Sequence, residues 1–199
     1  MSEAPILHLD ISISLEAGDW EAAVADVEQR VEAAARAAFD AADRPDILGV
    51  APAEMSLVLA DDALVQTLNR DYRDKDKPTN VLSFALLDGS DDTDDVLARD
   101  EGMPILIGDV ILAFETVQRE AREQGKSVED HLTHLVIHGV LHLLGYDHLS
   151  DPDADRMERL ETSILARMGI ADPYSANPAQ ADGERGETGA DGATTPQTT

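Results

Sequence analysis

The sequence predicts an α+β fold in which a mixed sheet of about four strands is covered by helices. In the first half of the chain, short apolar runs typical of strands alternate with stretches that repeat apolar residues at helical spacing. In the second half, helical spacing dominates. The chain has 199 residues, enough for one domain with a substantial core or for a domain and a tail. The order of the strands is not readable from the pattern.

Strands are predicted at residues 6–13, 54–60, 81–87 and 104–112. The last of these segments is almost continuously apolar and should be buried, yet it contains Asp109. Burying a carboxylate without a partner costs several kcal/mol. Asp109 is therefore expected to bind a partner, either a metal-ligating histidine or an arginine such as Arg73.

Helices are predicted from apolar periodicity together with residues that cap or end a helix. Asp61 and Ser127 are suitable N-caps, and Ser150 or Asp151 can begin the last helix. Gly145 can end the helix before it, because glycine adopts the left-handed conformation without steric cost. The expected helices span residues 19–39, 61–72, 113–124, 127–145 and 150–168.

Five of the six histidines lie within residues 131–148. Four of them are spaced by three, four and four residues and so share one stripe of the predicted helix: His131, His134, His138 and His142. After Gly145 the chain can turn back and return His148 towards this stripe. His138, His142 and His148 would then offer three nitrogens to one point, the ligand number at which a catalytic zinc keeps a position open for water.

Other interpretations of this stretch stay open. An amphipathic helix can bury histidines that bind one another or face solvent, without any metal. Imidazole also binds copper, nickel and iron, and zinc is favoured because it needs no redox partner. His131 and His134 could orient a ligand, contact a substrate or belong to the core. Gly139 stands where metallopeptidases carry a glutamate as general base, so peptide hydrolysis is disfavoured.

The histidine stretch resembles the signature of the YbeY family of bacterial rRNA maturation factors. The matching residues are His138-Gly139-x-Leu141-His142-Leu143-x-Gly145-Tyr146-Asp147-His148. Three further segments are similar to the family: Tyr72 to Phe84, Gly108-Asp109-Val110, and Asp172-Pro173-Tyr174, which resembles the point where members end. The likeness covers roughly residues 6–174. Asp74 and Ala85 replace a glycine and a proline usual in the family, although aspartate also tolerates a left-handed turn.

This resemblance implies a compact single domain over residues 1–174, with the metal-binding helix near its centre. It implies a metal-dependent endoribonuclease that is specific for single strands, with one zinc ion on His138, His142 and His148. The implied role is maturation of 16S rRNA at its 3′ end and ribosome quality control. The expected partners are rRNA and proteins of the small ribosomal subunit, without DNA. The resemblance also marks Arg73 as functionally important.

In the expected mechanism, the metal lowers the pKa of bound water towards about 7, and the resulting hydroxide attacks the phosphorus of an RNA backbone. Arg73 orients the phosphate and stabilises the charge that builds in the transition state. No general base is evident, so either the metal-bound water itself or His134 is expected to take part in proton transfer.

The formal net charge of -26 argues against a polyanionic substrate. Adaptation to a salty cytoplasm, delivery of RNA by protein partners, or the absence of an RNA substrate would each account for it.

Three segments differ in charge from the rest of the chain. Residues 70–77 contain four cations and three acids, so they form a weak cationic patch with a net charge of about +1. Residues 88–102 hold seven acids and one arginine and are expected to form an exposed, mobile insertion. Residues 175–199 are expected to form a disordered acidic tail.

Two other functions are compatible with these residues. The chain could be a ribosome assembly factor with a structural zinc that binds basic ribosomal proteins through its acidic surface. It could also hydrolyse small phosphoesters or amides. The sequence has no cysteine, which excludes a disulfide scaffold and suits the cytoplasm, the expected location. Neither a secretion signal nor a membrane span is expected.

Overall fold

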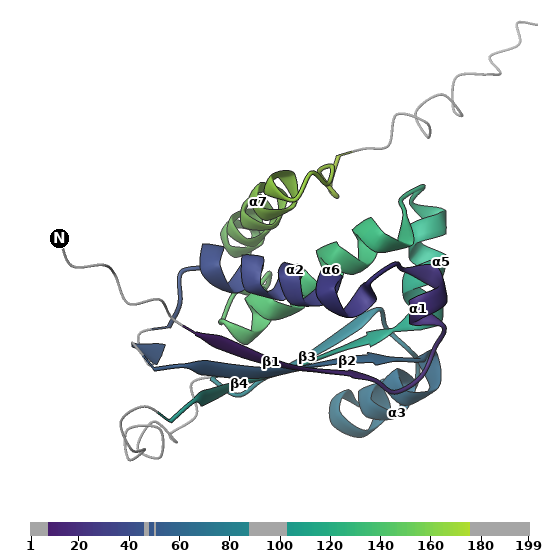
Figure 1. Cartoon of the computed structure of the whole chain (residues 1–199), viewed down its shortest axis with the longest axis horizontal. Helices are drawn as coiled ribbons and strands as arrows, with labels where there is room; N and C mark the ends of the chain where they lie inside the picture. Colours follow the sequence, from purple (N-terminus) through teal and green to yellow (C-terminus); the bar gives the residue numbers. More distant parts are fainter. Residues whose placement is uncertain (1–7, 46–47, 50, 88–102, 176–199) are drawn as a thin grey trace, which may run out of the picture.

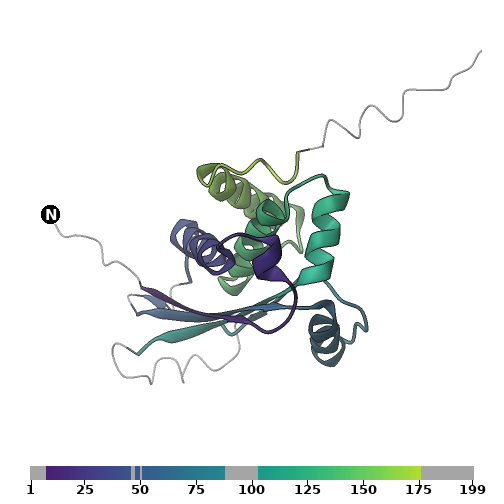
Figure 2. The same cartoon turned by 45° about the vertical axis from the view of Figure 1, so that its right-hand side comes forward.

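The computed structural model describes residues 8–45, 48–49, 51–87 and 103–175. The predicted insertion at residues 88–102 and all of the predicted tail except Ser175 lie outside these residues. Within them, one sheet separates two layers of helix (Figures 1 and 2). On one face lie α1 (Trp20–Ala23), α2 (Val27–Ala41), α5 (Phe114–Glu123), α6 (Val128–Leu143) and α7 (Asp151–Arg167), and on the other lies α3 (Asp62–Arg73).

The sheet is mixed, and its strands follow the order β1 (Leu9–Leu15), β2 (Ala53–Ala60), β4 (Ile105–Ala113) and β3 (Val81–Ala85). Strand β2 pairs in parallel with both β1 and β4. Strand β3 runs antiparallel to β4 and ends the sheet on that side. The predicted α+β class with a mixed sheet of four strands is therefore confirmed.

Helix α6, which carries the histidines, is central to the fold. It contacts α2, α5 and α7 as well as β3 and β4. Gly139 lets it approach the sheet closely, because a Cβ atom built there would lie 2.7 Å from Val110 Cγ1 and 3.2 Å from Ser83 Oγ. A larger side chain at this position would push the histidine helix away from the strands beside it.

The helix predicted over residues 19–39 is wrong in one respect, since it is two helices. Asp26 adopts the left-handed conformation, with a φ of 49°, and separates α1 from α2. The break coincides with complete burial of Trp20, whose Nε1–H donates to the Ala60 carbonyl oxygen at 3.1 Å. Ala60 lies 40 residues further along the chain, so helical periodicity alone could not indicate this break.

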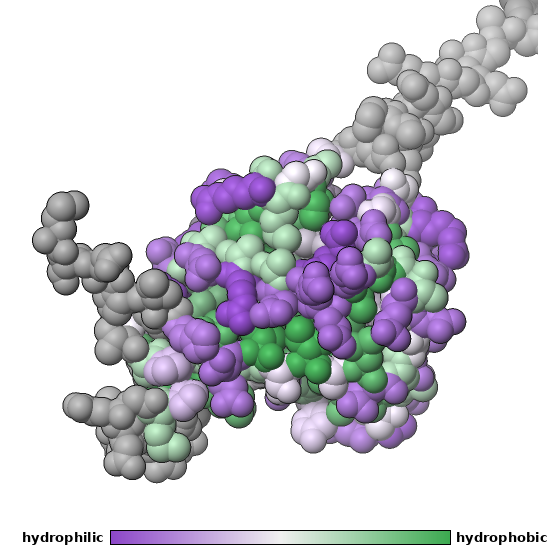
Figure 3. All heavy atoms as spheres, viewed as in Figure 1, coloured by the Kyte–Doolittle hydropathy of each residue, from purple (hydrophilic) through white to green (hydrophobic). Residues whose placement is uncertain are grey.

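Helices α3, α6 and α7 begin at the predicted caps, and α6 ends at Leu143, two residues before the predicted Gly145. Three N-cap side chains accept a hydrogen bond from a backbone N–H of the first turn, at 2.8, 3.0 and 3.4 Å: Asp61, Ser127 and Ser150. Gly145 has a φ of 87° and reverses the chain after α6. On the face shown in Figure 3, hydrophilic and apolar residues are interspersed. None of the helices in the described ranges is both long and apolar enough to cross a bilayer.

Candidate active site

Three histidine side chains converge where α6 ends and the chain turns back. His138 and His142 lie one turn apart on α6, and His148 follows the reversal at Gly145. Their ring centroids are 4.5 Å apart for His138 and His142, 5.0 Å for His142 and His148, and 5.8 Å for His138 and His148. One nitrogen from each ring lies within 4.8 Å of the other two. Among the described residues, no further histidine or acid joins this group.

Hydrogen bonds on the far side of two rings determine which nitrogens are free. His138 Nδ1 lies 2.8 Å from Glu161 Oε1, and His142 Nδ1 lies 2.9 Å from the Tyr146 carbonyl oxygen. A carboxylate and a carbonyl only accept hydrogen bonds, so each Nδ1 must carry the proton. When both rings are neutral, both Nε2 atoms carry a lone pair, and they face each other at 3.1 Å. Two lone pairs at this distance repel unless a cation lies between them.

This arrangement fits a zinc ion. Zinc binds imidazole nitrogen at about 2.0–2.1 Å in tetrahedral geometry, which places two ligand nitrogens about 3.3 Å apart. The 3.1 Å separation of the two Nε2 atoms is close to that value. The exposed His148 supplies a third imidazole from the solvent side. Metal ligation by these residues stays a prediction, and their geometry suits it.

The protonation states suit metal binding as well. Burial lowers the pKa of His142 to about 4, with the nearby His138 acting in the same direction, so the ring is neutral at pH 7. Burial on its own raises the pKa of Glu161, but hydrogen bonds from His134 and His138 outweigh it and hold that pKa at about 2. Neutral imidazoles and an ionised Glu161 are the forms that a bound cation requires.

The histidines line a cleft of about 420 Å³ between the end of α6 and β3. On the β3 side the cleft is reached by Arg73, whose Nη2 donates to the Ser83 carbonyl oxygen at 2.9 Å. The guanidinium also lies 5.7 Å from the centroid of the Phe84 ring. These contacts hold Arg73 beside the histidines and leave its other N–H groups available to a ligand. The lining residues are Arg73, Thr79, Asn80, Val81, Ser83, Ala85, His138, His142, Gly145, Tyr146, Asp147 and His148.

A second hollow, of about 350 Å³, adjoins this cleft and shares Arg73 and Thr79 with it. Lys75, Lys77 and Arg119 also line it. Among the described residues, no ion pair involves Arg73, Lys75 or Lys77. This cationic hollow is defined by Arg73, Lys75, Lys77 and Arg119. Arg119 comes from α5 and lies 3.9 Å from Asp62 Oδ2, and Glu120 also lines the hollow. The lining therefore carries four cations and one acid, because it joins α5 to residues 73–77.

Residues 14–169 match the model of a protein family described as Endoribonuclease YbeY. The match covers more than half of the chain and includes every residue that lines the cleft. The chain belongs to the YbeY endoribonuclease family.

Relatives named Endoribonuclease YbeY share about half of their aligned residues with this chain, which confirms the resemblance seen in the sequence. The one from Paramagnetospirillum magneticum is 54% identical over 166 residues, or 83% of this chain and 96% of the relative. The one from Rhodospirillum rubrum is 55% identical over 161 residues, or 79% and 78%. A Thermotoga maritima protein solved in solution aligns at a TM-score of 0.47 and 22% identity, over 88% of this chain and 99% of that one.

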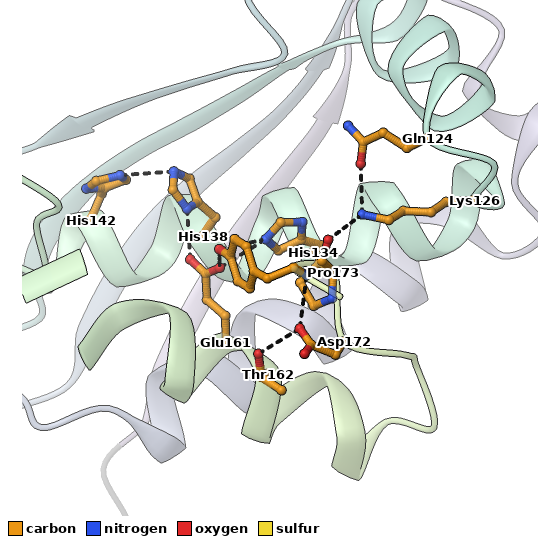
Figure 4. Close-up of polar contacts among 10 residues, drawn as sticks. Gln124, Lys126, His134, His138, His142, Glu161, Thr162, Asp172 and Pro173 are labelled. Atoms are coloured by element: carbon orange, nitrogen blue, oxygen red, sulfur yellow. Dashed lines mark hydrogen bonds and ion pairs between the residues drawn. The ribbon is translucent and has the colours of Figure 1, made fainter. Parts of the chain in front are cut away.

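In this member of the YbeY family, the other two histidines of α6 point to acids outside the cleft. His134 Nε2 lies 3.0 Å from Glu161 Oε2 (Figure 4). His134 is not among the residues that line the cleft. His131 is 3% exposed, and its Nε2 lies 3.0 Å from Glu120 Oε2. The structure therefore separates both residues from the three converging histidines. A proton-transfer role for His134 stays a prediction.

The expectation for Asp109 is wrong. Its side chain is only partly buried, and among the described residues neither Arg73 nor a histidine donates a hydrogen bond to it. Partial exposure lets water solvate the carboxylate, so the cost that motivated a protein partner does not arise.

Sequence reasoning missed two residues at this site, Glu161 and Arg119. Glu161 is completely buried and belongs to the apolar stripe of α7, four residues after Met157 and three before Ile164. An acid within such a stripe is a signal that could have identified it. Arg119 has no comparable signal, because an arginine on a helix is ordinarily a solvated surface residue.

Proposed function

We propose that this chain is a metal-dependent endoribonuclease that hydrolyses phosphodiester bonds of single-stranded rRNA, with one zinc ion on His138, His142 and His148. Membership of the YbeY endoribonuclease family supports the reaction class. The observation that carries the proposal is the convergence of three imidazoles, two with opposed bare Nε2 atoms, beside Arg73 in one cleft. The 16S rRNA 3′ end is the proposed place of cleavage, and the cytoplasm the proposed compartment.

The cleft residues have separate tasks in this reaction. His138, His142 and His148 would hold the zinc ion, and that ion would supply activation of a bound water by lowering its pKa towards about 7. Arg73 donates hydrogen bonds to non-bridging oxygens of the scissile phosphate and stabilises charge that builds on them. Because the Ser83 carbonyl oxygen already orients the guanidinium, Arg73 loses little conformational freedom when it binds the phosphate.

The cationic hollow gives the RNA backbone a path away from the scissile phosphate. Removing two of its cations by Lys75→Ala and Lys77→Ala should weaken binding of single-stranded RNA. Each lost phosphate contact should reduce the slope of log affinity against log salt by about 0.7. Fluorescence anisotropy over a salt series measures this slope. Arg167→Ala, which removes an exposed cation of α7, is the control and should leave the slope unchanged. An equal reduction of the slope in the Arg167→Ala protein and in the protein without Lys75 and Lys77 would contradict the proposed path.

The proposed function is tested with end-labelled RNA of one sequence in single-stranded and double-stranded form. We expect cleavage of the single strand alone, loss of cleavage after chelation, and recovery when zinc is returned. Cleavage that survives complete metal removal would overturn the metal-dependent reaction.

The same experiment distinguishes the two alternatives from the sequence. Turnover of a small phosphodiester without cleavage of RNA would indicate a small-molecule hydrolase. Absence of all turnover, with retained binding to small-subunit proteins, would indicate an assembly factor with a structural zinc. The net charge of -26 favours basic ribosomal proteins as partners, and we propose that they accompany the rRNA substrate.

A further inference from the structure

Glu161 is a carboxylate in the interior of the protein. Its side chain is 0% exposed, and a buried carboxylate is stable only when several donors bind it. Three donors do so (Figure 4). His138 Nδ1 lies 2.8 Å from Oε1, His134 Nε2 lies 3.0 Å from Oε2, and the Tyr174 hydroxyl donates to Oε2.

We propose that Glu161 is a positioning residue for the metal ligand His138, an inference that rests on the proposed metal site. Acceptance of the Nδ1 proton by Oε1 leaves His138 Nε2 bare and turns it towards His142. The negative charge of Glu161 also makes the imidazole a stronger donor to a cation. Glu161 thus acts on the metal through His138 and touches neither the metal nor the substrate.

The two carboxylate oxygens of Glu161 bind different partners. His134 and Tyr174 both bind Oε2, which holds the carboxyl group so that Oε1 faces His138. Burial, together with the adjacent Glu161, raises the pKa of the Tyr174 hydroxyl, which therefore stays protonated and donates. This arrangement assigns His134 to the orientation of Glu161.

The segment that carries Tyr174 is fixed in place after α7. Lys126 Nζ donates to the Pro173 carbonyl oxygen at 2.9 Å. Asp172 Oδ1 accepts from Thr162 Oγ1 at 3.2 Å and from the Tyr174 backbone N–H at 2.9 Å. The chain after α7 is thereby held across α6, with the Tyr174 hydroxyl against Glu161.

The chain contains a matched control at the other end of α6. Glu120 Oε2 lies 3.0 Å from His131 Nε2 and 2.9 Å from Asn80 Nδ2, so this acid also pairs with a buried histidine. His131, however, is not one of the three converging histidines. A change of Glu120 should therefore affect stability without changing the affinity for zinc.

The test compares the zinc affinity of Glu161→Gln, Glu161→Ala and Glu120→Gln proteins by competition with a chromophoric chelator. We expect a loss of about 10-fold for Glu161→Gln, which keeps an acceptor but not the charge, and of about 100-fold for Glu161→Ala. Glu120→Gln should bind zinc as the unchanged protein does. Nitrogen NMR of the metal-free proteins should show the His138 proton on Nδ1 in the unchanged protein and shared with Nε2 in Glu161→Ala.

The outcomes separate this inference from the proposed function. Failure of the unchanged protein to bind zinc would overturn the metal site itself. The role of Glu161 is overturned if the unchanged protein binds zinc and the zinc affinity of Glu161→Gln lies within about twofold of it. It is also overturned if Glu120→Gln loses as much zinc affinity as Glu161→Gln. Should Glu161→Ala not fold, Glu161→Gln decides the matter, because the amide fills the same volume.

Discussion

Replacement of His142 by alanine should remove both zinc binding and RNA cleavage. His142 is the middle member of the three histidines, since its ring is the nearest neighbour of both other rings. Two remaining imidazoles cannot hold a catalytic zinc ion in place. Loss of a residue that only orients a ligand costs about 10- to 100-fold in affinity or activity, so loss of a ligand should exceed about 100-fold in both. Metal content after gel filtration and cleavage of labelled single-stranded RNA measure the two effects.

His8→Ala is the control for this change. His8 is the described histidine outside α6 and the loop after it, and it is exposed beside Asp10 at the start of β1. Its loss should leave zinc content and cleavage unchanged. A His142→Ala protein that retains one zinc ion per chain would contradict the three-histidine site.

Replacement of Arg73 by alanine should lower the rate of RNA cleavage by about 100- to 1000-fold, the usual effect of removing one preorganised donor to transition-state charge. Zinc affinity should not change, because Arg73 contacts Ser83 and Phe84 and none of the histidines. Lysine should restore only part of the rate, since an ammonium group lacks the planar fork that binds two phosphate oxygens. Single-turnover cleavage at saturating zinc measures the rate.

Arg70→Ala separates this effect from a general loss of positive charge. Arg70 lies on the same helix, but its Nε is paired with Asp71 and the residue is absent from the lining of the cleft. Its replacement should change the rate little. A comparable loss in Arg70→Ala, or a loss of zinc affinity in Arg73→Ala, would contradict a direct role in the reaction.

Those parts of the fold that depend on neighbouring residues could be predicted from the sequence. The N-caps at Asp61 and Ser127 act within one turn, and Gly145 ends a helix through its own backbone conformation. The convergence of His138, His142 and His148 follows from one helical turn and one reversal, so local reasoning suffices for it as well.

Features that depend on distant segments could not be predicted in the same way. The break at Asp26 goes with the burial of Trp20 against Ala60, and the antiparallel position of β3 at the end of the sheet depends on strand pairing. The hydrogen-bond acceptor for His138 Nδ1 is Glu161, which lies on another helix, α7. The net charge of -26 is a property of the whole chain and does not show that four cations line one hollow.

The contact between Arg73 and Ser83 also bears on how the protein behaves at high concentration. Strand β3 ends the described sheet, and the Ser83 carbonyl oxygen that binds Arg73 belongs to it. A sheet edge with free carbonyl groups can recruit a strand from a neighbouring molecule, and a charge placed on that edge opposes such growth. We therefore expect Arg73 to limit self-association through this edge in addition to its proposed role in the reaction, because its guanidinium lies against the Ser83 carbonyl oxygen.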